Sequence, residues 1–197
     1  MATTTKGADA QTQTPTRRLF TSDEFERMGE VGVFEEDDRV ELIEGEIYQV
    51  SAIGVPHAIC VNNLTALLAE AYGRRIILSI QNPVHGDQRN FPQPDVTVLR
   101  LDAYGDDRHP RPADVLLIVE VSDSTLRFDA RIKLPVYPRV DIEETWIVDL
   151  KGRVVHRYTQ PSAEGYQSTV SYRSGDVVES TTLPSVRFAV DDILPRK

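Results

Sequence analysis

Two acidic residues stand where a carboxylate could do chemistry. Asp95 follows Pro94 at the start of an expected strand, and Glu120 interrupts an otherwise apolar strand that runs from Val115 to Val121. A carboxylate in a buried strand is costly unless something pairs with it, and a metal ion is one such partner. Two carboxylates from neighbouring strands, together with a backbone carbonyl, would make an oxygen-rich site suited to Mg²⁺ or Mn²⁺.

A lysine and a tyrosine follow on the next expected helix. Lys133 belongs to a segment that must pack back over the sheet, and Tyr137 lies one turn further along the same face. A lysine directed at a metal-bound water can stabilise the attacking hydroxide or the charge that builds on phosphate. The same residues also fit a purely structural arrangement, in which Asp95 caps a turn, Glu120 ends its strand at the solvent edge and Lys133 is a surface charge. The residue types alone leave both interpretations open.

The elements that must position these residues alternate between helices and strands. A capping box of Thr21 and Glu24 predicts a short helix that ends near Gly29, and further helices are expected at about 56–72 and 125–140. Pro135 and Pro138 indicate that the last helix is short or kinked. Strands are expected near 40–43, 47–50, 76–80, 95–101, 115–121, 146–148, 154–158, 166–172 and 186–190. This order predicts an α/β or α+β protein with a central sheet and antiparallel C-terminal strands.

Length and composition bound the class of protein. The chain has 197 residues and a net charge of −9, from 22 basic and 31 acidic residues, which excludes a polybasic nucleic-acid binder. We expect a disordered tail at 1–17, which is rich in Thr and Gln, followed by one domain at 18–197. The single cysteine, Cys60, excludes an intramolecular disulfide framework and suits a reducing cytoplasm. Since we find neither a signal peptide nor a membrane-spanning run, we expect a cytoplasmic protein without a membrane partner.

Ordered blocks of sequence extend the pattern around the two acids. They are Val40–Ile47, His57, Gln93–Val98, Leu117–Ser124, Asp129 with Lys133 and Tyr137, and Glu144–Asp149. Together, over about residues 19–195, these blocks resemble the Uma-two type of restriction endonucleases, a family of the PD-(D/E)XK nuclease superfamily. The resemblance implies a restriction-endonuclease-like fold, with a mixed central β-sheet flanked by helices.

The resemblance also implies a role for individual residues. Asp95 corresponds to the acid of the PD element and Glu120 to the second acid. The lysine that usually stands two positions after the second acid is absent, because Ser122 occupies that position. In this family the lysine is found on the following helix, where Lys133 stands. Glu41 matches an acid of the first core strand and would complete the metal shell directly or through water.

Five further residues are candidate contacts to the substrate. His57 lies at a helix start and Gln81 at the end of a strand, although a helix cap and a plain sheet-edge amide explain them equally. Arg127 and Arg131 would give the neighbourhood of the site positive charge, unless they are ordinary solvated residues. Tyr137 is the fifth candidate.

The sequence therefore predicts an endonuclease that uses Mg²⁺ (or Mn²⁺) to hydrolyse phosphodiester bonds in nucleic acid, with duplex DNA implied by the family. Asp95 and Glu120, with the carbonyl of Val121, would hold the ion, and Lys133 would position or deprotonate water in the same cleft. A homodimer would help an acidic chain to present positive charge to DNA. Two alternatives stay open. One is a catalytically silent nucleic-acid-binding module, and the other is a protein-interaction domain in which the acids form structural salt bridges.

Overall fold

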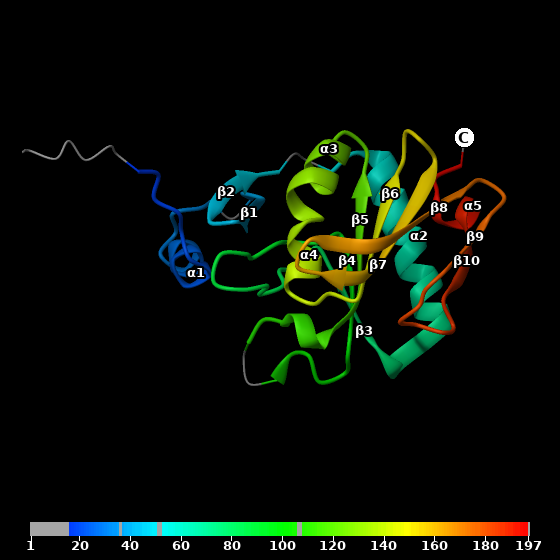
Figure 1. The fold of residues 1–197 in the computed structure, drawn as a ribbon, viewed down its shortest axis with the longest axis horizontal. Coiled ribbons are helices and arrows are strands. Elements are labelled where there is room, and N and C mark those ends of the chain that lie inside the picture. The colour runs from blue at the N-terminus through cyan, green and yellow to red at the C-terminus, as the bar shows by residue number, and fades with distance from the viewer. Residues whose placement is uncertain (1–15, 36, 51–52, 106–107, 197) are drawn as a thin grey trace, which may run out of the picture.

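A six-stranded mixed sheet forms the centre of the molecule (Figure 1). The computed structural model describes residues 16–35, 37–50, 53–105 and 108–196. The strands, in spatial order, are β3 (Ile77–Ile80), β4 (Val96–Leu99), β5 (Val115–Ser122), β6 (Glu144–Asp149), β7 (Val154–Ser162) and β8 (Gly165–Arg173). Neighbouring strands run antiparallel, except that β5 and β6 are parallel. The predicted mixed sheet with antiparallel C-terminal strands is confirmed.

Strand β5 lies in the interior of the sheet because both of its faces are apolar. Val119 and the other odd-numbered residues from 117 to 121 belong to the core that α2 (Val55–Tyr72) covers. Ile118 belongs to a second core on the opposite face, together with Tyr137. Successive side chains of a strand point to opposite faces, so Glu120 shares the face of Ile118. The acid therefore faces the segment that connects β5 to β6.

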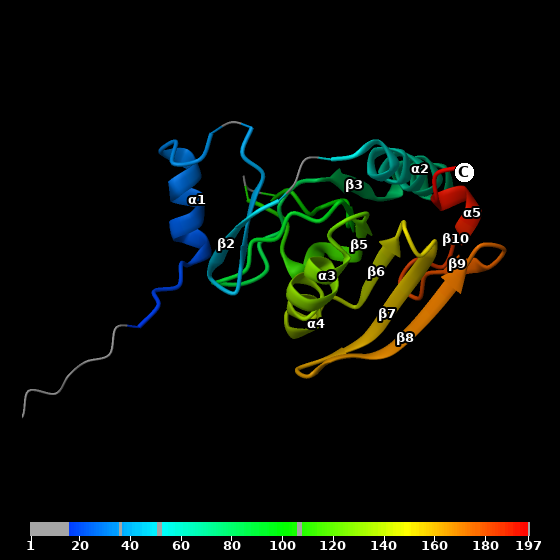
Figure 2. The ribbon, with the colours of Figure 1, turned by 90° about the horizontal axis from the view of Figure 1, so that it is seen from above.

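This connection is a crossover, which the parallel pairing of β5 with β6 requires. It consists of α3 (Leu126–Phe128), a π-helical turn at Asp129–Lys133 and α4 (Val136–Arg139). The structure confirms a helical segment that is broken near Pro135 and Pro138, and it adds a π turn that the sequence did not indicate. Figure 2 shows α2 and the crossover on opposite sides of the sheet. Lys133 is thereby positioned over the same face as Glu120.

A small N-terminal unit lies beside the sheet (Figure 1). It contains α1 (Ser22–Glu30) and an antiparallel pair of strands, β1 (Val40–Ile43) and β2 (Glu46–Gln49). The unit is attached to the loop between β3 and β4, where Leu42 and Phe91 exchange backbone hydrogen bonds of 3.4 and 2.7 Å. Both side chains are also part of a small apolar cluster with α1. This attachment brings β1 to the edge of the crossover.

The C-terminal segment covers the α2 face and is fixed by one buried carboxylate. It contains β9 (Val177–Glu179), β10 (Arg187–Ala189) and α5 (Val190–Ile193). Glu144, at the start of β6, is 0% exposed. It accepts a hydrogen bond of 2.6 Å from Trp146 and several of 2.6–3.3 Å from residues 180–182. Because a buried carboxylate needs such donors, the position of 180–182 is tied to the sheet.

Two sequence predictions differ from the structure or lie outside it. The strand predicted at 95–101 is shorter, because the pairing of β4 with β5 is irregular between Val98 and Leu99 and Leu101 lies in an exposed turn. Of the tail predicted at 1–17, residues 1–15 lie outside the described residues. Within the described part of the chain, no helix is long and apolar enough to cross a membrane.

Replacing Glu144 by Gln should lower the free energy of unfolding by about 1.5–3 kcal/mol, the range for hydrogen bonds to a charged group. An amide cannot accept the same set of bonds, and its NH₂ would face backbone donors. Urea unfolding would measure the loss. Glu143→Gln, at the exposed neighbouring position, is the control and should change stability by less than about 0.5 kcal/mol. Equal stability of the two variants would contradict this role of Glu144.

Candidate active site

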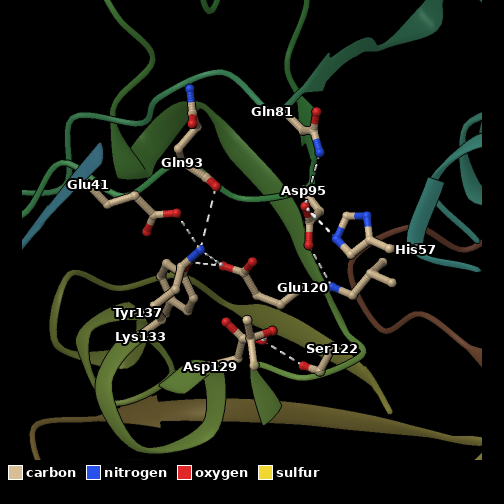
Figure 3. Close-up of polar contacts among 12 residues, drawn as sticks. Glu41, His57, Gln81, Gln93, Asp95, Glu120, Ser122, Asp129, Lys133 and Tyr137 are labelled. Carbon is tan, nitrogen blue, oxygen red and sulfur yellow. Dashed lines mark hydrogen bonds and ion pairs between the residues drawn. The ribbon is translucent and has the colours of Figure 1, made fainter. Parts of the chain in front are cut away.

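Side chains from five segments converge on one cavity of about 170 Å³ (Figure 3). They are Glu41 on β1, His57 on α2, Asp95 directly before β4, Glu120 on β5 and Lys133 at the end of the π turn. The N-terminal unit, the sheet and the helices on both of its faces all contribute. Asp95, Glu120 and Lys133, which the sequence predicts to meet, all line this cavity.

The ammonium of Lys133 lies among the acidic groups and is nearly inaccessible to solvent, with 3% of the residue exposed. Its Nζ is 2.8 Å from Glu120 Oε1 and 3.2 Å from Glu41 Oε1, and it donates to the carbonyl of Gln93 at 3.5 Å. Burial lowers the pKa of Lys133, but the charges of Glu120 and Glu41 raise that pKa by more, so it lies well above its ordinary value. This direction of the shift favours the protonated, positively charged form of the side chain.

Tyr137 contacts the same carboxylate from the next turn of the crossover. Residues four apart share a helical face, and the Tyr137 hydroxyl donates to Glu120 Oε1, the oxygen that also contacts Lys133. Burial, followed by the charge of Glu120, raises the pKa of Tyr137 well above its ordinary value, so the hydroxyl keeps its proton. Tyr137 is 1% exposed and orients Glu120, and its contact with a substrate stays a prediction.

Asp95 is held by three donors. His57 Nε2 lies 3.0 Å from Asp95 Oδ1, Gln81 donates to the same oxygen at 3.4 Å, and the Val121 amide donates to Oδ2 at 2.8 Å. Burial raises the pKa of Asp95, but the hydrogen bond and charge of His57, with smaller contributions from Lys133 and Val121, bring it below its ordinary value. Asp95 is consequently ionised and oriented.

A further carboxylate, Asp129, lines the cavity although the sequence analysis gave it no role at the site. It is 6% exposed, and its Oδ2 accepts hydrogen bonds from Ser122 at 2.7 Å and Thr125 at 2.6 Å. Burial raises the pKa of Asp129 against the opposing charge of Lys133. Its spacing of four residues from Lys133 was a signal in the sequence, but the same spacing is common in exposed ion pairs of helices.

The cluster holds more negative than positive groups. Its buried carboxylates are those of Glu41, Asp95, Glu120 and Asp129, and its buried ammonium is that of Lys133. Burial raises the pKa of Glu120 to about 8, since the attraction of Lys133 offsets the loss of solvation only in part. Burial raises the pKa of Glu41 in the same way. A divalent cation would relieve both the burial of charge and the repulsion between the acids.

The donor set fits such a cation. Glu41 Oε2 is buried and has no hydrogen-bond partner among the described residues, so one acceptor oxygen at this cavity is unsatisfied. Carboxylate oxygens are the protein ligands that Mg²⁺ and Mn²⁺ prefer. The carboxylates of Glu120 and Asp95 have different partners. Glu120 contacts Lys133 and Tyr137, whereas Asp95 accepts a hydrogen bond from the Val121 amide. Within the described residues, the one group of three acids or histidines whose ligand atoms all lie within 4.8 Å of one another is outside this cavity.

The remaining predicted contacts divide into two groups. His57 and Val121 line the cavity, whereas Gln81 contacts Asp95 from outside it. Arg127 and Arg131 are exposed on the crossover and do not line the cavity, so their contact with phosphate stays a prediction, as does metal binding by the Val121 carbonyl.

Sequence reasoning could not find the carbonyl of Gln93 or the contact between His57 and Asp95. A backbone carbonyl carries no signal in the residue type. The contact between His57 and Asp95 exists because α2 packs on the face of the sheet next to the start of β4, and the two residues are far apart in the sequence.

Comparisons with known proteins agree with this architecture. The sequence profile of the Uma2 family, described as "Putative restriction endonuclease", matches residues 22–191. The fold resembles the crystal structure of "a putative nuclease belonging to DUF820" from Anabaena variabilis ATCC 29413, with a TM-score of 0.70 and 15% sequence identity over 88% of this chain and 97% of that chain. No curated protein gives a significant match to the sequence. Because the profile match spans most of the chain, the protein belongs to the Uma2 family of restriction-endonuclease-like proteins.

Proposed function

We propose that the protein is an endonuclease that depends on a divalent metal ion and hydrolyses phosphodiester bonds in duplex DNA. The observation that carries this proposal is the surplus of buried carboxylates around Lys133, in a cavity that is accessible to a ligand. Membership of a nuclease family implies a nucleic acid substrate. The choice of DNA follows from the family's description as restriction endonucleases.

Asp95, Glu120 and Glu41 are the residues that we expect to hold Mg²⁺ or Mn²⁺, with the Val121 carbonyl as a further oxygen. When bound, the ion supplies a water of lowered pKa and polarises the phosphate. Asp95 is prepared for this role, because His57 and the Val121 amide keep it ionised and oriented. The unsatisfied Oε2 of Glu41 offers another ligand atom.

Lys133 acts in this proposal as a fixed positive charge. The sequence left two roles open to it, positioning water or removing a proton from it. Its raised pKa disfavours the second role, because a protonated ammonium cannot accept a proton. A buried cation beside the phosphate would instead offset the negative charge that develops in the transition state.

Binding of DNA has to overcome the net charge of −9. Neutralisation of phosphates supplies most of the affinity of proteins for DNA. Arg127 and Arg131 are exposed on the same crossover as Lys133, and we propose that they contact the DNA backbone outside the cavity. We further propose that a homodimer presents two such surfaces to the two strands of a duplex.

The first prediction concerns metal binding. Mg²⁺ at about 100 times its dissociation constant should stabilise the folded protein by about 2.7 kcal/mol, which raises Tm by about 5–10 °C for a chain of this size. Asp95→Asn should abolish the shift, since it removes a ligand charge, whereas Glu143→Gln at an exposed position should retain it. Thermal unfolding with Mg²⁺ and with EDTA measures both. An undiminished shift in Asp95→Asn would move the metal to another site.

The second prediction concerns pH. Burial raises the pKa of Glu120 to about 8, so its carboxylate takes up a proton as the pH falls from 8 to 6. A bound cation favours the ionised form, so Mg²⁺ binding should release protons and strengthen as pH rises from 6 to 8. Calorimetry in two buffers of different ionisation enthalpy counts the released protons. Binding that does not change with pH would show that Glu120 does not ligate the ion.

The third prediction concerns turnover. Lys133→Met and Glu120→Gln should each lower the rate of supercoiled plasmid nicking in Mg²⁺ by about 10²–10³, by analogy with the loss of one electrostatic partner of a transition state. Tyr137→Phe removes only a hydroxyl and provides a milder variant that should fold even if the others do not. Its nicking rate should fall at saturating DNA, because the orientation of Glu120 is lost. Glu143→Gln is the matched control with wild-type activity.

The outcomes separate the proposed enzyme from its two alternatives. Equal nicking by wild type and all variants would assign the activity to a contaminant or another site. Binding of duplex DNA without cleavage of DNA or RNA in any divalent metal would favour a silent nucleic-acid-binding module. Absence of both metal and nucleic acid binding would favour a protein-interaction domain with structural salt bridges.

A further inference from the structure

Three side chains of metal-binding types converge where α1 meets the loops that flank β4, and a fourth contacts one of them. They are Asp23 and Glu26 on α1, His85 between β3 and β4, and His109 between β4 and β5. We propose that they form a second metal site, distinct from the Asp95 cavity, which binds Zn²⁺ or a chemically similar transition metal ion. This proposal does not rest on the proposed nuclease function.

The distances suit a site that closes around an ion. One ligand atom each from Asp23, Glu26 and His85 lie within 4.8 Å of one another. His109 Nε2 lies 3.7 Å from Glu26 Oε1, which adds a fourth group. Ligand atoms around a tetrahedral Zn²⁺ are about 3.3 Å apart, given metal–ligand bonds of about 2.0–2.2 Å. The three grouped atoms would therefore have to approach one another by at most about 1.5 Å, and His109 is placed by its contact with Glu26.

Hydrogen bonds of the backbone hold the contributing segments in place. The amide of Ser22, next to Asp23, donates to Gln88 O at 2.8 Å, and the Ser22 hydroxyl donates to Asp87 O at 2.9 Å. The amide of His85 donates to Pro110 O at 2.8 Å, so the two loops that carry the histidines are joined directly. The entropic cost of gathering ligands from separate segments is thus largely met by the fold itself.

Phe91 orients both imidazoles. Its ring centroid lies 5.7 Å from that of His85 and 5.1 Å from that of His109, and each pair is at an interplanar angle of 86°. Both histidines therefore pack against the same apolar ring from its edge or face. An imidazole whose orientation is already restricted loses less conformational freedom when it binds a ligand.

The donor set distinguishes this site from the cavity around Asp95. Two imidazoles and two carboxylates are the ligands of Zn²⁺ and neighbouring transition metals, whereas the cavity offers mainly carboxylate oxygens, which suit Mg²⁺. The two carboxylates also carry the charge that a divalent ion neutralises. An ion here would fasten α1 to the loops around β4, and through α1 the unit whose strand β1 carries Glu41.

The test is Co²⁺ binding to the untagged Asp95→Asn chain, in which the other site is disabled. Co²⁺ stands in for Zn²⁺ and reports nitrogen and oxygen ligands through its visible absorption. We expect one Co²⁺ per chain, displaced by Zn²⁺. Adding His85→Ala or Glu26→Gln should weaken binding at least about tenfold. Adding His156→Ala, which removes a histidine of β7 that is paired with Ser171, should change nothing.

Two results would overturn the proposal. One is the absence of Co²⁺ binding in Asp95→Asn, and the other is equal binding with and without His85→Ala. Either would mean that Glu26 and His109 form an ordinary ion pair. If Asp95→Asn does not fold, the wild-type chain in excess Mg²⁺, which favours the oxygen-rich cavity, gives the same comparison. Loss of Mg²⁺ binding in Asp95→Asn with retention of Co²⁺ would separate the two sites.

Discussion

The arrangement of the cavity depends on the ion pairs that the buried ammonium of Lys133 forms with Glu41 and Glu120. This ammonium joins three parts of the molecule. Its partners are Glu41 of the N-terminal unit, Glu120 of the central sheet, and the carbonyl of Gln93 in the loop between β3 and β4. Removal of one charged side chain from a buried ion pair leaves the charge of its partner uncompensated. Such a loss typically destabilises a protein by about 3–5 kcal/mol. The cation thus sets the relative position of the acids as well as their charge. Although Lys133 belongs to the crossover, its ammonium reaches Glu120 on the central strand β5.

The topology of the sheet determines which face becomes polar. A parallel pair at β5 and β6 requires the crossover, and the crossover carries Asp129, Lys133 and Tyr137 over Glu120. The opposite face of β5 is covered by α2, whose first turn supplies His57 to Asp95 at the edge of the same cavity. The polar cluster consequently borders both apolar cores, because Val121 belongs to one core and Tyr137 to the other. Burial of the acids raises the pKa of Glu120, and a bound cation would favour its ionised form.

The two acidic clusters differ in burial and in donor type, and these differences imply different roles. The cavity around Asp95 is built from buried carboxylates and is open to a ligand, as expected of a centre that acts on a substrate. The cluster at α1 combines carboxylates with imidazoles of loops that are already hydrogen-bonded to each other, and His85 is only half-buried. A mixed donor set joining separate segments is typical of metal ions that stabilise a fold. Both clusters are connected to Glu41. The first cluster contains Glu41 itself, and the second includes residues of α1, which belongs to the same N-terminal unit as β1.

Local patterns in the sequence determined most of the elements. The capping box at Thr21 and Glu24 is present, α2 ends at Tyr72 before Gly73, and the apolar run at 115–121 is an interior strand, because each of these features depends on residues close together in the chain. The sequence also determined that Asp95 and Glu120 stand at unusual positions and that Lys133 follows on the next helical segment. The resemblance to a family then gave Lys133 the place of the missing motif lysine.

Only the tertiary structure decided how these groups meet. In the structure Tyr137 contacts Glu120 and Asp129 lines the cavity. His57 contacts Asp95, and His85 lies near Glu26. The contacts of Tyr137, His57 and His85 have no signature in residue spacing, because each joins elements whose approach is set by packing of the helices and loops on the sheet. Charge, burial and the number of donors around a carboxylate are properties of that packing. For this reason the sequence could name the acids, while their pKa values and partners followed only from the fold.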